Sequence, residues 1–330
     1  MIRSSKVKPL GSVLCITPNP AIDRTLLTPS FQLGDVTRAA EVLVAAGGKG
    51  LNVARAVQTL GGVPLCMGLL GGHNGRFLAD LAQKEALNAS WTWYEGETRT
   101  CVIIVPQGGE VTVINAAGQV PPQAWQQFCE DVRQQARLAD MVCISGSMPL
   151  GAADNAPADL IAAIKASGVP IWVDSSGVAL QQAVAAVPTG IKVNHHEASD
   201  LLNVQIGDVK TAVQAAQAVR QNGIENVVIT LGEQGAVFVN EMGSWWAKGE
   251  AITAVSAVGS GDSFFAGLLT ALSQNKSPDE ALRYAVAAGT ANALTAGGGQ
   301  FKMADFSQIL RATAVSKTPH SSSDSHFCLD

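Results

Sequence analysis

The chain has 330 residues, a formal net charge of −5 and no long basic run, so nucleic acid and anionic membranes are poor candidates for partners. Apolar residues make up 47% and charged residues 15%, which predicts a folded protein with a substantial core. The six cysteines form no CxxC pair, and no stretch resembles a membrane span or a signal peptide. We therefore expect a reduced, cytoplasmic protein with one large domain.

Short apolar, β-rich runs alternate with helical stretches along most of the chain. The predicted strands are residues 13–19, 141–146, 171–176, 190–195 and 226–232. The predicted helices include residues 156–168 and 209–223, each closed by a glycine as helix C-termini often are. This alternation predicts an α/β fold with a mostly parallel sheet, helices on both faces, and ligands beyond the carboxyl ends of the strands.

Three segments depart from this alternation. Residues 24–46 and 90–115 are strand-like without intervening helices, and we expect them to pair into a small separate β-sheet that acts as a lid or an oligomer surface. Residues 313–330 are Ser-rich and aperiodic, which predicts a disordered tail.

The first polar motif is "AAGGKGLNVARAVQTLGG", in which Gly47, Gly48 and Gly50 allow the backbone to approach another group closely. Lys49 and Asn52 offer hydrogen-bond donors to a polar ligand. The alternative interpretation is an ordinary glycine turn before a helix, with Lys49 in solvent.

A second motif, "KVNHHEASD", places Asn194 and Glu197 at the end of a predicted strand. A carboxylate and an amide there are suited to organising Mg²⁺ around phosphate groups, mainly through water. His195 and His196 also suggest a metal, but adjacent histidines on a short loop rarely face one ion. We interpret them as surface or packing residues.

A third motif, "AVGSGDSFFAGLLTAL", leads from a glycine-rich turn into an apolar helix. The chain lacks GxxxxGK[ST] and has no GxGxxG after its first strand, which excludes a standard P-loop and disfavours a dinucleotide site. The turn Gly259–Gly261 aims backbone N–H groups at one point, where they would stabilise a phosphoryl group. Asp262 is then placed to accept a proton from an attacking hydroxyl, unless it only caps the helix.

Taken in this order, the motifs resemble those of the PfkB (ribokinase-like) family of carbohydrate kinases. The resemblance covers roughly residues 12–312 and is carried by "GGKGLNVAR" and "VGSGDSFFAG", with "TLGEQGA" between them. It implies one ribokinase-like domain over 12–312, with a small β-sheet lid, and ATP and Mg²⁺ as cofactors. Two departures stand beside functional positions: "KVN" where relatives often have "KPN", and Ser256-Ala257 before the last motif.

The resemblance also implies roles for individual residues. The phosphoryl transfer would use Asp262 as general base and an anion hole of Gly259, Ser260 and Gly261. Sugar hydroxyls would be held by Asp23, Gly48, Lys49 and Asn52. A phosphate on the substrate would bind Arg99, assisted by Arg38 and Ser147. The nucleotide site would be lined by Asn194, Thr230, Gly232 and Gly235, with Glu197 ordering Mg²⁺.

Within the family, "TPNPAIDRT", "LGDVTRAAEV", "GETRTC" and "ISGSMP" resemble the phosphosugar branch. Strand alternation predicts that Arg99 faces the ligand while Thr98 and Thr100 face outward; otherwise Arg99 is a surface residue paired with Glu97 or Glu95.

This branch implies ATP-dependent phosphorylation of a phosphorylated ketohexose, with fructose 1-phosphate favoured over fructose 6-phosphate and tagatose 6-phosphate. A homodimer through the lid sheets is expected, because the run "TRTCVIIV" needs cover. Two other functions stay open: a nicotinamide dehydrogenase, which the missing glycine fingerprint disfavours, and a non-catalytic sugar-phosphate sensor, which would not need Asp262.

Overall fold

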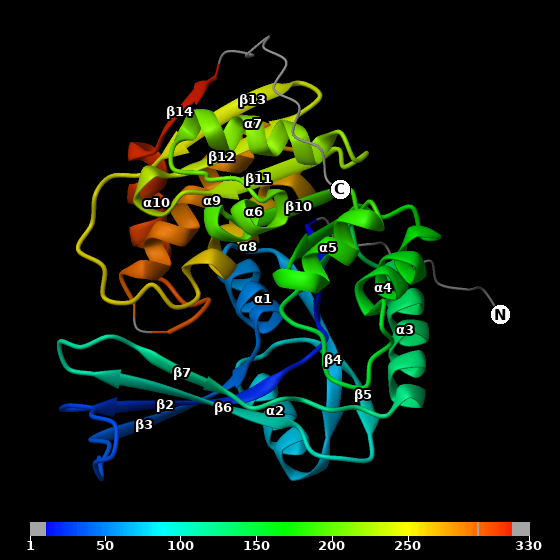
Figure 1. Ribbon diagram of the computed structural model, residues 1–330, viewed down its shortest axis with the longest axis vertical. Helices are drawn as coiled ribbons and strands as arrows, with labels where there is room; N and C mark the ends of the chain where they lie inside the picture. Colours follow the sequence, from blue (N-terminus) through cyan, green and yellow to red (C-terminus); the bar gives the residue numbers. More distant parts are fainter. Residues whose placement is uncertain (1–10, 296, 319–330) are drawn as a thin grey trace.

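The computed structural model describes residues 11–295 and 297–318, which form two β-sheets and two helical layers (Figure 1). The strands are β1 (Ser12–Thr17), β2 (Ala21–Thr28), β3 (Glu41–Gly47), β4 (Val63–Gly71), β5 (Ala89–Tyr94), β6 (Arg99–Pro106), β7 (Thr112–Asn115), β8 (Met141–Ser145), β9 (Ile171–Asp174), β10 (Gly190–Asn194), β11 (Asn226–Thr230), β12 (Ala236–Asn240), β13 (Gly243–Lys248) and β14 (Ala314–Lys317).

The α-helices are α1 (Lys49–Thr59), α2 (Gly72–Lys84), α3 (Pro122–Ala136), α4 (Ala156–Lys165), α5 (Gly177–Ala185), α6 (His195–Leu202), α7 (Val209–Arg220), α8 (Ser260–Ser273), α9 (Pro278–Ala293) and α10 (Met303–Ala312). Within the described residues, none of them is long and apolar enough to cross a membrane. The five cysteines described are all free.

The large sheet has the order β14-β13-β12-β11-β10-β9-β8-β1-β4-β5. Strands β5, β4, β1, β8, β9, β10 and β11 run parallel, and β12, β13 and β14 follow antiparallel at one edge. Every strand predicted from the apolar runs lies in the parallel part. The predicted fold class is confirmed.

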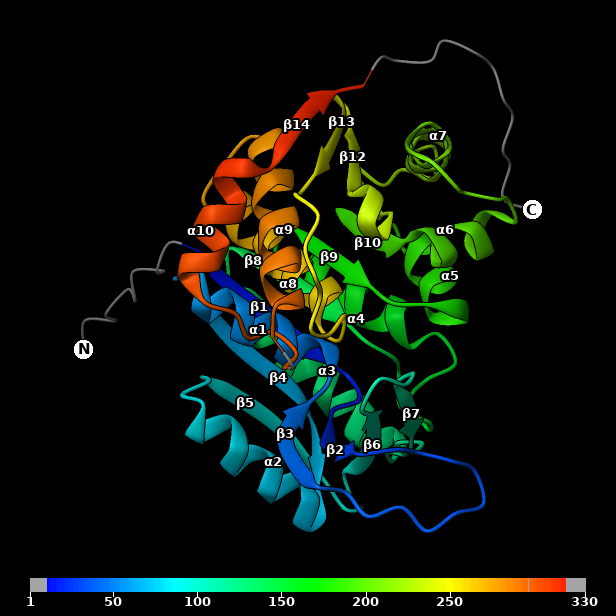
Figure 2. The same ribbon diagram turned by 90° about the vertical axis from the view of Figure 1, so that its left-hand side faces the viewer.

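Alternating side chains of the central strand β1 enter two different cores. Leu14 and Ile16 pack in the core beneath α3 to α7. Val13 and Cys15 pack in the core beneath α1, α2, α8, α9 and α10. Figure 2 shows these two helical layers on opposite sides of the sheet. A strand buried on both faces is apolar throughout, which is why the sequence signal was clear.

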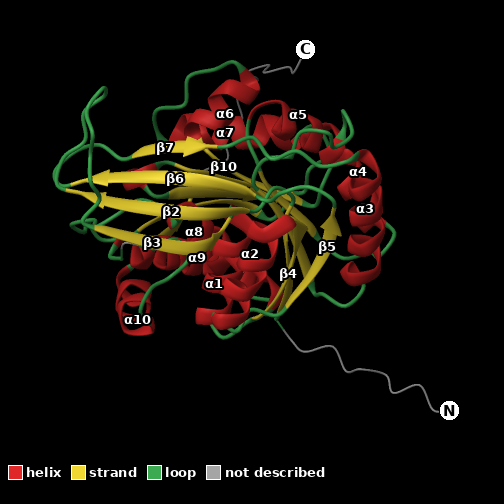
Figure 3. Cartoon of the chain, turned by 90° about the horizontal axis from the view of Figure 1, so that it is seen from below, coloured by secondary structure: helices red, strands yellow, loops and turns green. Residues whose placement is uncertain are grey.

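The small sheet has the order β3-β2-β6-β7 and extends from the body of the molecule (Figure 3). Strands β2 and β6 run parallel at its centre, with Ala21 opposite Arg99. The prediction for 90–115 is wrong for its first strand. Residues Ala89–Tyr94 extend the large sheet beside β4 instead, because α2 provides the crossover that a parallel pair requires.

The prediction of a disordered tail from 313 onward is also wrong at its start. Residues Ala314–Lys317 form β14, which pairs antiparallel with β13 and so supplies hydrogen-bond partners to that edge. The rest of the predicted tail, from residue 319, lies outside the described residues.

Candidate active site

Polar side chains gather where the parallel strands end. Asp174, Asn194 and Thr230 are the last residues of β9, β10 and β11, and Asn19 follows β1. Asn194 and Thr230 stand opposite each other in register. The carboxyl edge of a parallel sheet is where such folds bind ligands, so this edge is the candidate site.

Asp262 lies in the first turn of α8 and is 7% exposed. Its carboxylate accepts a 2.8 Å hydrogen bond from Asn52 Nδ2, which reaches it from α1. The N-cap position of α8 is occupied by Gly259, not by Asp262. The carboxylate is therefore engaged across the site with the second glycine motif.

Burial raises the pKa of Asp262 to about 6, and the negative charge of Asp174 adds to this effect. Lys49, the Asn52 hydrogen bond and Lys192 act in the opposite direction. At neutral pH such a carboxylate is ionised and is a stronger base than an exposed aspartate. These are the properties that a general base needs.

A fully buried carboxylate, Asp174, binds two ammonium groups from different elements. Its oxygens lie 3.2 Å from Lys49 Nζ and 3.0 Å from Lys192 Nζ. Although burial opposes ionisation, the two lysines hold the pKa of Asp174 below its usual value. The Asp174 charge raises the pKa of Lys49, with contributions from Asp262 and Glu197, so Lys49 stays cationic beside the candidate base.

The turn Gly259–Gly261 is held against a second glycine-rich loop. Gly259 has φ of 77°, and a Cβ there would overlap the Gly298 backbone. Asn292 connects the two loops: it accepts from Gly299 N at 2.9 Å and donates to the Val258 carbonyl at 2.9 Å. Ser260 N donates to the Ala257 carbonyl at 3.2 Å. The next two N–H groups, of Gly261 and Asp262, lie in the first turn of α8, where the helix itself provides no acceptor.

Asp23 lies on β2 of the small sheet, close to two arginines. Burial raises the pKa of Asp23 to about 6, whereas the charges of Arg55 and Arg99 lower it. A Cβ at Gly47 would overlap the Asp23 carboxylate, so a glycine is required at this position of β3.

Arg99 is fixed by two backbone carbonyls. Its Nε and Nη2 donate to the Asn19 carbonyl at 3.2 and 2.8 Å, and its Nη1 donates to the Ala116 carbonyl at 3.2 Å. Glu97 instead accepts from the first N–H groups of α2, so the surface ion pair with Arg99 is not formed. The expectation that Thr98 faces outward is wrong: it is buried and accepts from Gly71 N at 2.9 Å.

Asn194 and Glu197 form a reciprocal cap at the start of α6. Glu197 Oε2 accepts from Asn194 N at 2.8 Å, and Asn194 Oδ1 accepts from Glu197 N at 2.9 Å. The cap uses Oε2 of Glu197, and Oε1 has no hydrogen-bond donor among the described residues. A carboxylate oxygen with open coordination fits Mg²⁺, which takes few protein ligands and keeps several waters.

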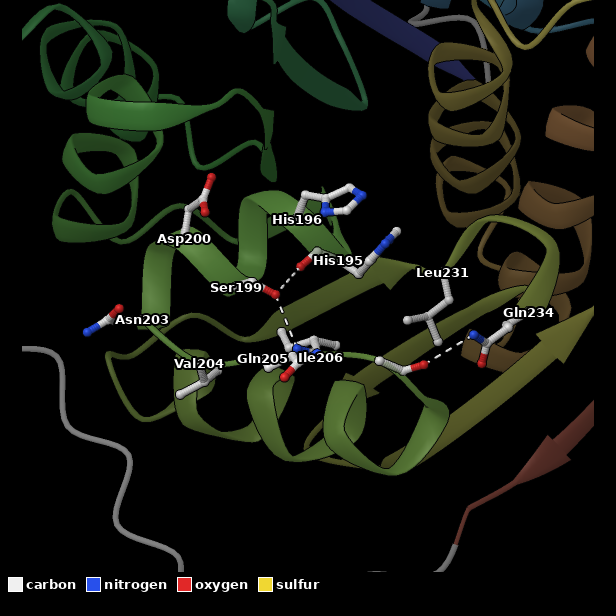
Figure 4. A pocket seen from close by; sticks show the side chains of 11 residues that line it. His195, His196, Ser199, Asp200, Asn203, Val204, Gln205, Ile206, Leu231 and Gln234 are labelled. Atoms are coloured by element: carbon white, nitrogen blue, oxygen red, sulfur yellow. Dashed lines mark hydrogen bonds between the residues drawn. The ribbon is translucent and has the colours of Figure 1, made fainter.

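Gly232 and Gly235 shape the turn between β11 and β12, with φ of 59° and 91°. A pocket of about 790 Å³ opens beside this turn and α6 (Figure 4). His195 and His196 line it with ring centroids 3.9 Å apart. No group of three or more His, Cys, Asp or Glu side chains that could hold a metal ion occurs within the described residues.

Two predicted substrate residues lie away from this cluster or at its rim. Arg38 is exposed in the loop between β2 and β3, where it lines a separate pocket of about 280 Å³. Ser147 is exposed and accepts a 3.2 Å hydrogen bond from Asn19 Nδ2, beside the carbonyl that holds Arg99. Gly48 lies at the start of α1 with φ of 123°.

Sequence reasoning missed Asp174, Lys192, Arg55 and Asn292. Asp174 stands inside a run that was interpreted only as a strand, Lys192 opens the motif "KVNHHEASD" but was given no role, and Asn292 lies in an apolar helix. The triple glycine 297–299 was a usable signal, because consecutive glycines indicate close backbone approach.

Comparisons with known proteins find relatives in sequence and in fold. The 1-phosphofructokinase of Escherichia coli K12 is 35% identical over 276 residues, covering 83% of this chain and 88% of its own. The crystal structure of E. coli phosphofructokinase-2 in complex with fructose-6-phosphate has a TM-score of 0.84 at 27% identity, covering 92% and 99% of the two chains. The tetrameric inhibited form of the same enzyme has a TM-score of 0.84 at 28% identity, with the same coverage.

The family comparison spans almost the whole domain. Residues 13–303 match the pfkB family of carbohydrate kinases. Such enzymes are phosphotransferases that act on an alcohol group, which is the chemistry that a buried base beside a helix N-terminus can serve. This chain therefore belongs to the pfkB carbohydrate kinase family.

Proposed function

We propose that this kinase uses ATP to phosphorylate a phosphorylated ketohexose, with fructose 1-phosphate as the favoured substrate and fructose 1,6-bisphosphate as the product. The observation that carries the proposal is the buried Asp262 carboxylate, held by Asn52 at the first turn of α8. A sugar hydroxyl placed there would give its proton to Asp262 as its oxygen attacks the γ-phosphorus of ATP.

The charges around Asp262 suit this transfer. The N–H groups of the first turn of α8 that have no helical acceptor would stabilise negative charge as it increases on the transferred phosphoryl group. Lys49 adds a cation that Asp174 and Glu197 keep protonated. Both groups are positioned before the reaction, so they need little reorganisation.

A divalent cation fits the carboxyl edge beside Asn194. Glu197 would hold Mg²⁺ through its open carboxylate oxygen and water, and Thr230, Gly232 and Gly235 would border the nucleotide. When bound, Mg²⁺ neutralises charge on the phosphates of the nucleotide.

Arg99 is the candidate group for the phosphate that the substrate already carries. A guanidinium has five N–H donors, and three of them are used by the Asn19 and Ala116 carbonyls. One N–H therefore remains on each terminal nitrogen, which suits bidentate binding of phosphate oxygens.

The closest rival substrates are the ketohexose 6-phosphates, since one structural relative was solved with fructose-6-phosphate. The experiment is a substrate panel of fructose 1-phosphate, fructose 6-phosphate, tagatose 6-phosphate and free fructose, with ADP release as the readout. We expect the highest kcat/KM for fructose 1-phosphate. A higher value for a 6-phosphate would overturn the substrate, and no ADP release with any sugar would favour a sensor.

We also propose a homodimer that forms through the small sheets. Its two edge strands expose apolar side chains: Val42 and Leu43 of β3 are 48% and 41% exposed, and Val113 and Ile114 of β7 are 50% and 57% exposed. Exposed apolar edge strands are commonly covered by another chain. A relative with the same fold has been solved as a tetramer.

A further inference from the structure

Arg55 joins the candidate base to a partly buried ion pair outside the site. This residue of α1 is 6% exposed, and its Nε and Nη2 contact the Glu85 carboxylate at the end of α2, with Nη2 to Oε1 at 3.1 Å. Its Nη2 also donates to the Ala46 carbonyl. Its Nη1 donates to Asn52 Oδ1 at 2.9 Å. The other end of the same amide, Asn52 Nδ2, donates to Asp262.

The chemistry of these groups permits only one orientation of Asn52. A guanidinium has donors and no acceptor, so the Asn52 amide must turn its oxygen toward Arg55. Its amide nitrogen then points to Asp262, as observed. With the amide reversed, the Asn52 NH₂ group would face the N–H groups of Arg55, and the Asn52 amide oxygen would face the Asp262 carboxylate. Neither pair could form a hydrogen bond.

We propose that Arg55, held by Glu85, is a positioning residue for the phosphoryl transfer: it locks Asn52 with its amide nitrogen toward Asp262 and so holds the carboxylate in one orientation. The inference rests on the proposed role of Asp262. One carboxylate oxygen is occupied by Asn52, which leaves the other for the acceptor hydroxyl. A base that is free to rotate would spend less time in the reactive geometry.

A purely structural role for the pair makes a different prediction. Arg55 connects α1 with α2 and β3 through Glu85 and Ala46, so its loss would lower stability in any case. Stability alone, however, leaves the kcat of the folded enzyme unchanged. The separation of kcat from folding therefore distinguishes the two roles.

The test removes both charges at once, so that no buried charge is left unpaired: Arg55→Met/Glu85→Gln. The matched control, Arg133→Met/Glu130→Gln, makes the same substitutions in an exposed ion pair on α3. With ATP and the ketohexose phosphate that the wild type uses best, we expect kcat to fall about 10- to 100-fold while the KM for ATP changes less than about threefold. The control is expected to retain its kcat.

A double-mutant cycle with Asn52→Ala tests whether Arg55 acts through Asn52. In that background the loss of the ion pair is expected to lower kcat by less than about threefold, because there is no amide left to orient. A full, additive loss, or an unchanged kcat in the folded paired variant, would overturn the proposal. Should the paired variant not unfold cooperatively, Arg55→Lys replaces it, because an ammonium cannot reach all three partners.

The results that would contradict the proposed function differ from those that would contradict the role of Arg55. If fructose 1-phosphate is a poor substrate of the wild type, the substrate assignment is wrong, yet the cycle on the better substrate still decides the role of Arg55. If Asp262→Asn retains full kcat, Asp262 is not the base, whatever the cycle gives.

Discussion

Asp262 is a carboxylate whose burial favours proton uptake, and this has consequences for both rate and stability. Asp262→Asn keeps the size of the side chain and can still accept from Asn52, but it cannot take a proton. We expect kcat to fall about 10²- to 10⁴-fold with little change in ATP binding by calorimetry. A variant that keeps more than about a tenth of the wild-type kcat would show that Asp262 is not the base.

The same substitution is expected to stabilise the fold in a pH-dependent way. The pKa of Asp262 rises from 3.8 to about 6 on folding, mainly through burial, so ionised Asp262 lowers the free energy of unfolding above pH 6. This penalty disappears as the pH falls from about 6 to below 4. Urea unfolding should therefore show Asp262→Asn more stable by up to about 3 kcal/mol at pH 7.5 and not at pH 4. An equal difference at both pH values would contradict the burial argument.

Arg99 tests the substrate class directly. One charge-assisted bidentate contact is worth about 2–4 kcal/mol, so Arg99→Ala is expected to lower kcat/KM for a ketohexose phosphate by about 30- to 1000-fold. Loss of the Asn19 and Ala116 contacts would affect every substrate alike. The measurement is therefore the ratio of kcat/KM for the phosphorylated and unphosphorylated sugar. If this ratio stays constant, Arg99 does not bind the phosphate.

At the scale of elements, the close approach of two loops defines the anion site. Gly259→Ala places a Cβ against the Gly298 backbone at a φ of 77°. We expect a Tm several degrees lower and kcat reduced more than about tenfold, because the turn and the loop must separate. Gly168→Ala is the matched control, since Gly168 has φ of 69° but open space around it. Equal loss of activity in both variants would exclude a specific role for the contact.

Strands could be predicted from the sequence where both of their faces are buried, because burial requires a continuous apolar run. The sheet to which a strand belongs was harder to predict, because it depends on which strand it pairs with. The strand 171–174 was clear because both of its faces are buried, but the role of Asp174 depends on Lys49, which is 125 residues away in sequence. Strand β5 had the same residue character as β6, and only its register with β4 assigns it to the large sheet. Local motifs pointed to Asp262 and Asn52, whereas the contacts of Arg55 with Glu85 and of Asn292 with Val258 join residues 30 and 34 positions apart in sequence.

At the scale of the whole molecule, the small sheet exposes apolar side chains that no other part of the same chain covers. Its strands β3 and β7 leave two free edges, and apolar side chains stand on both. We expect a dimer in sedimentation equilibrium at micromolar concentration. Val113→Glu/Ile114→Glu is expected to produce monomers, because it places charges on β7. Leu138→Glu, at a residue 56% exposed beyond α3, is the matched control and should stay dimeric. A wild-type monomer with full activity would show that the small sheet serves only its own chain.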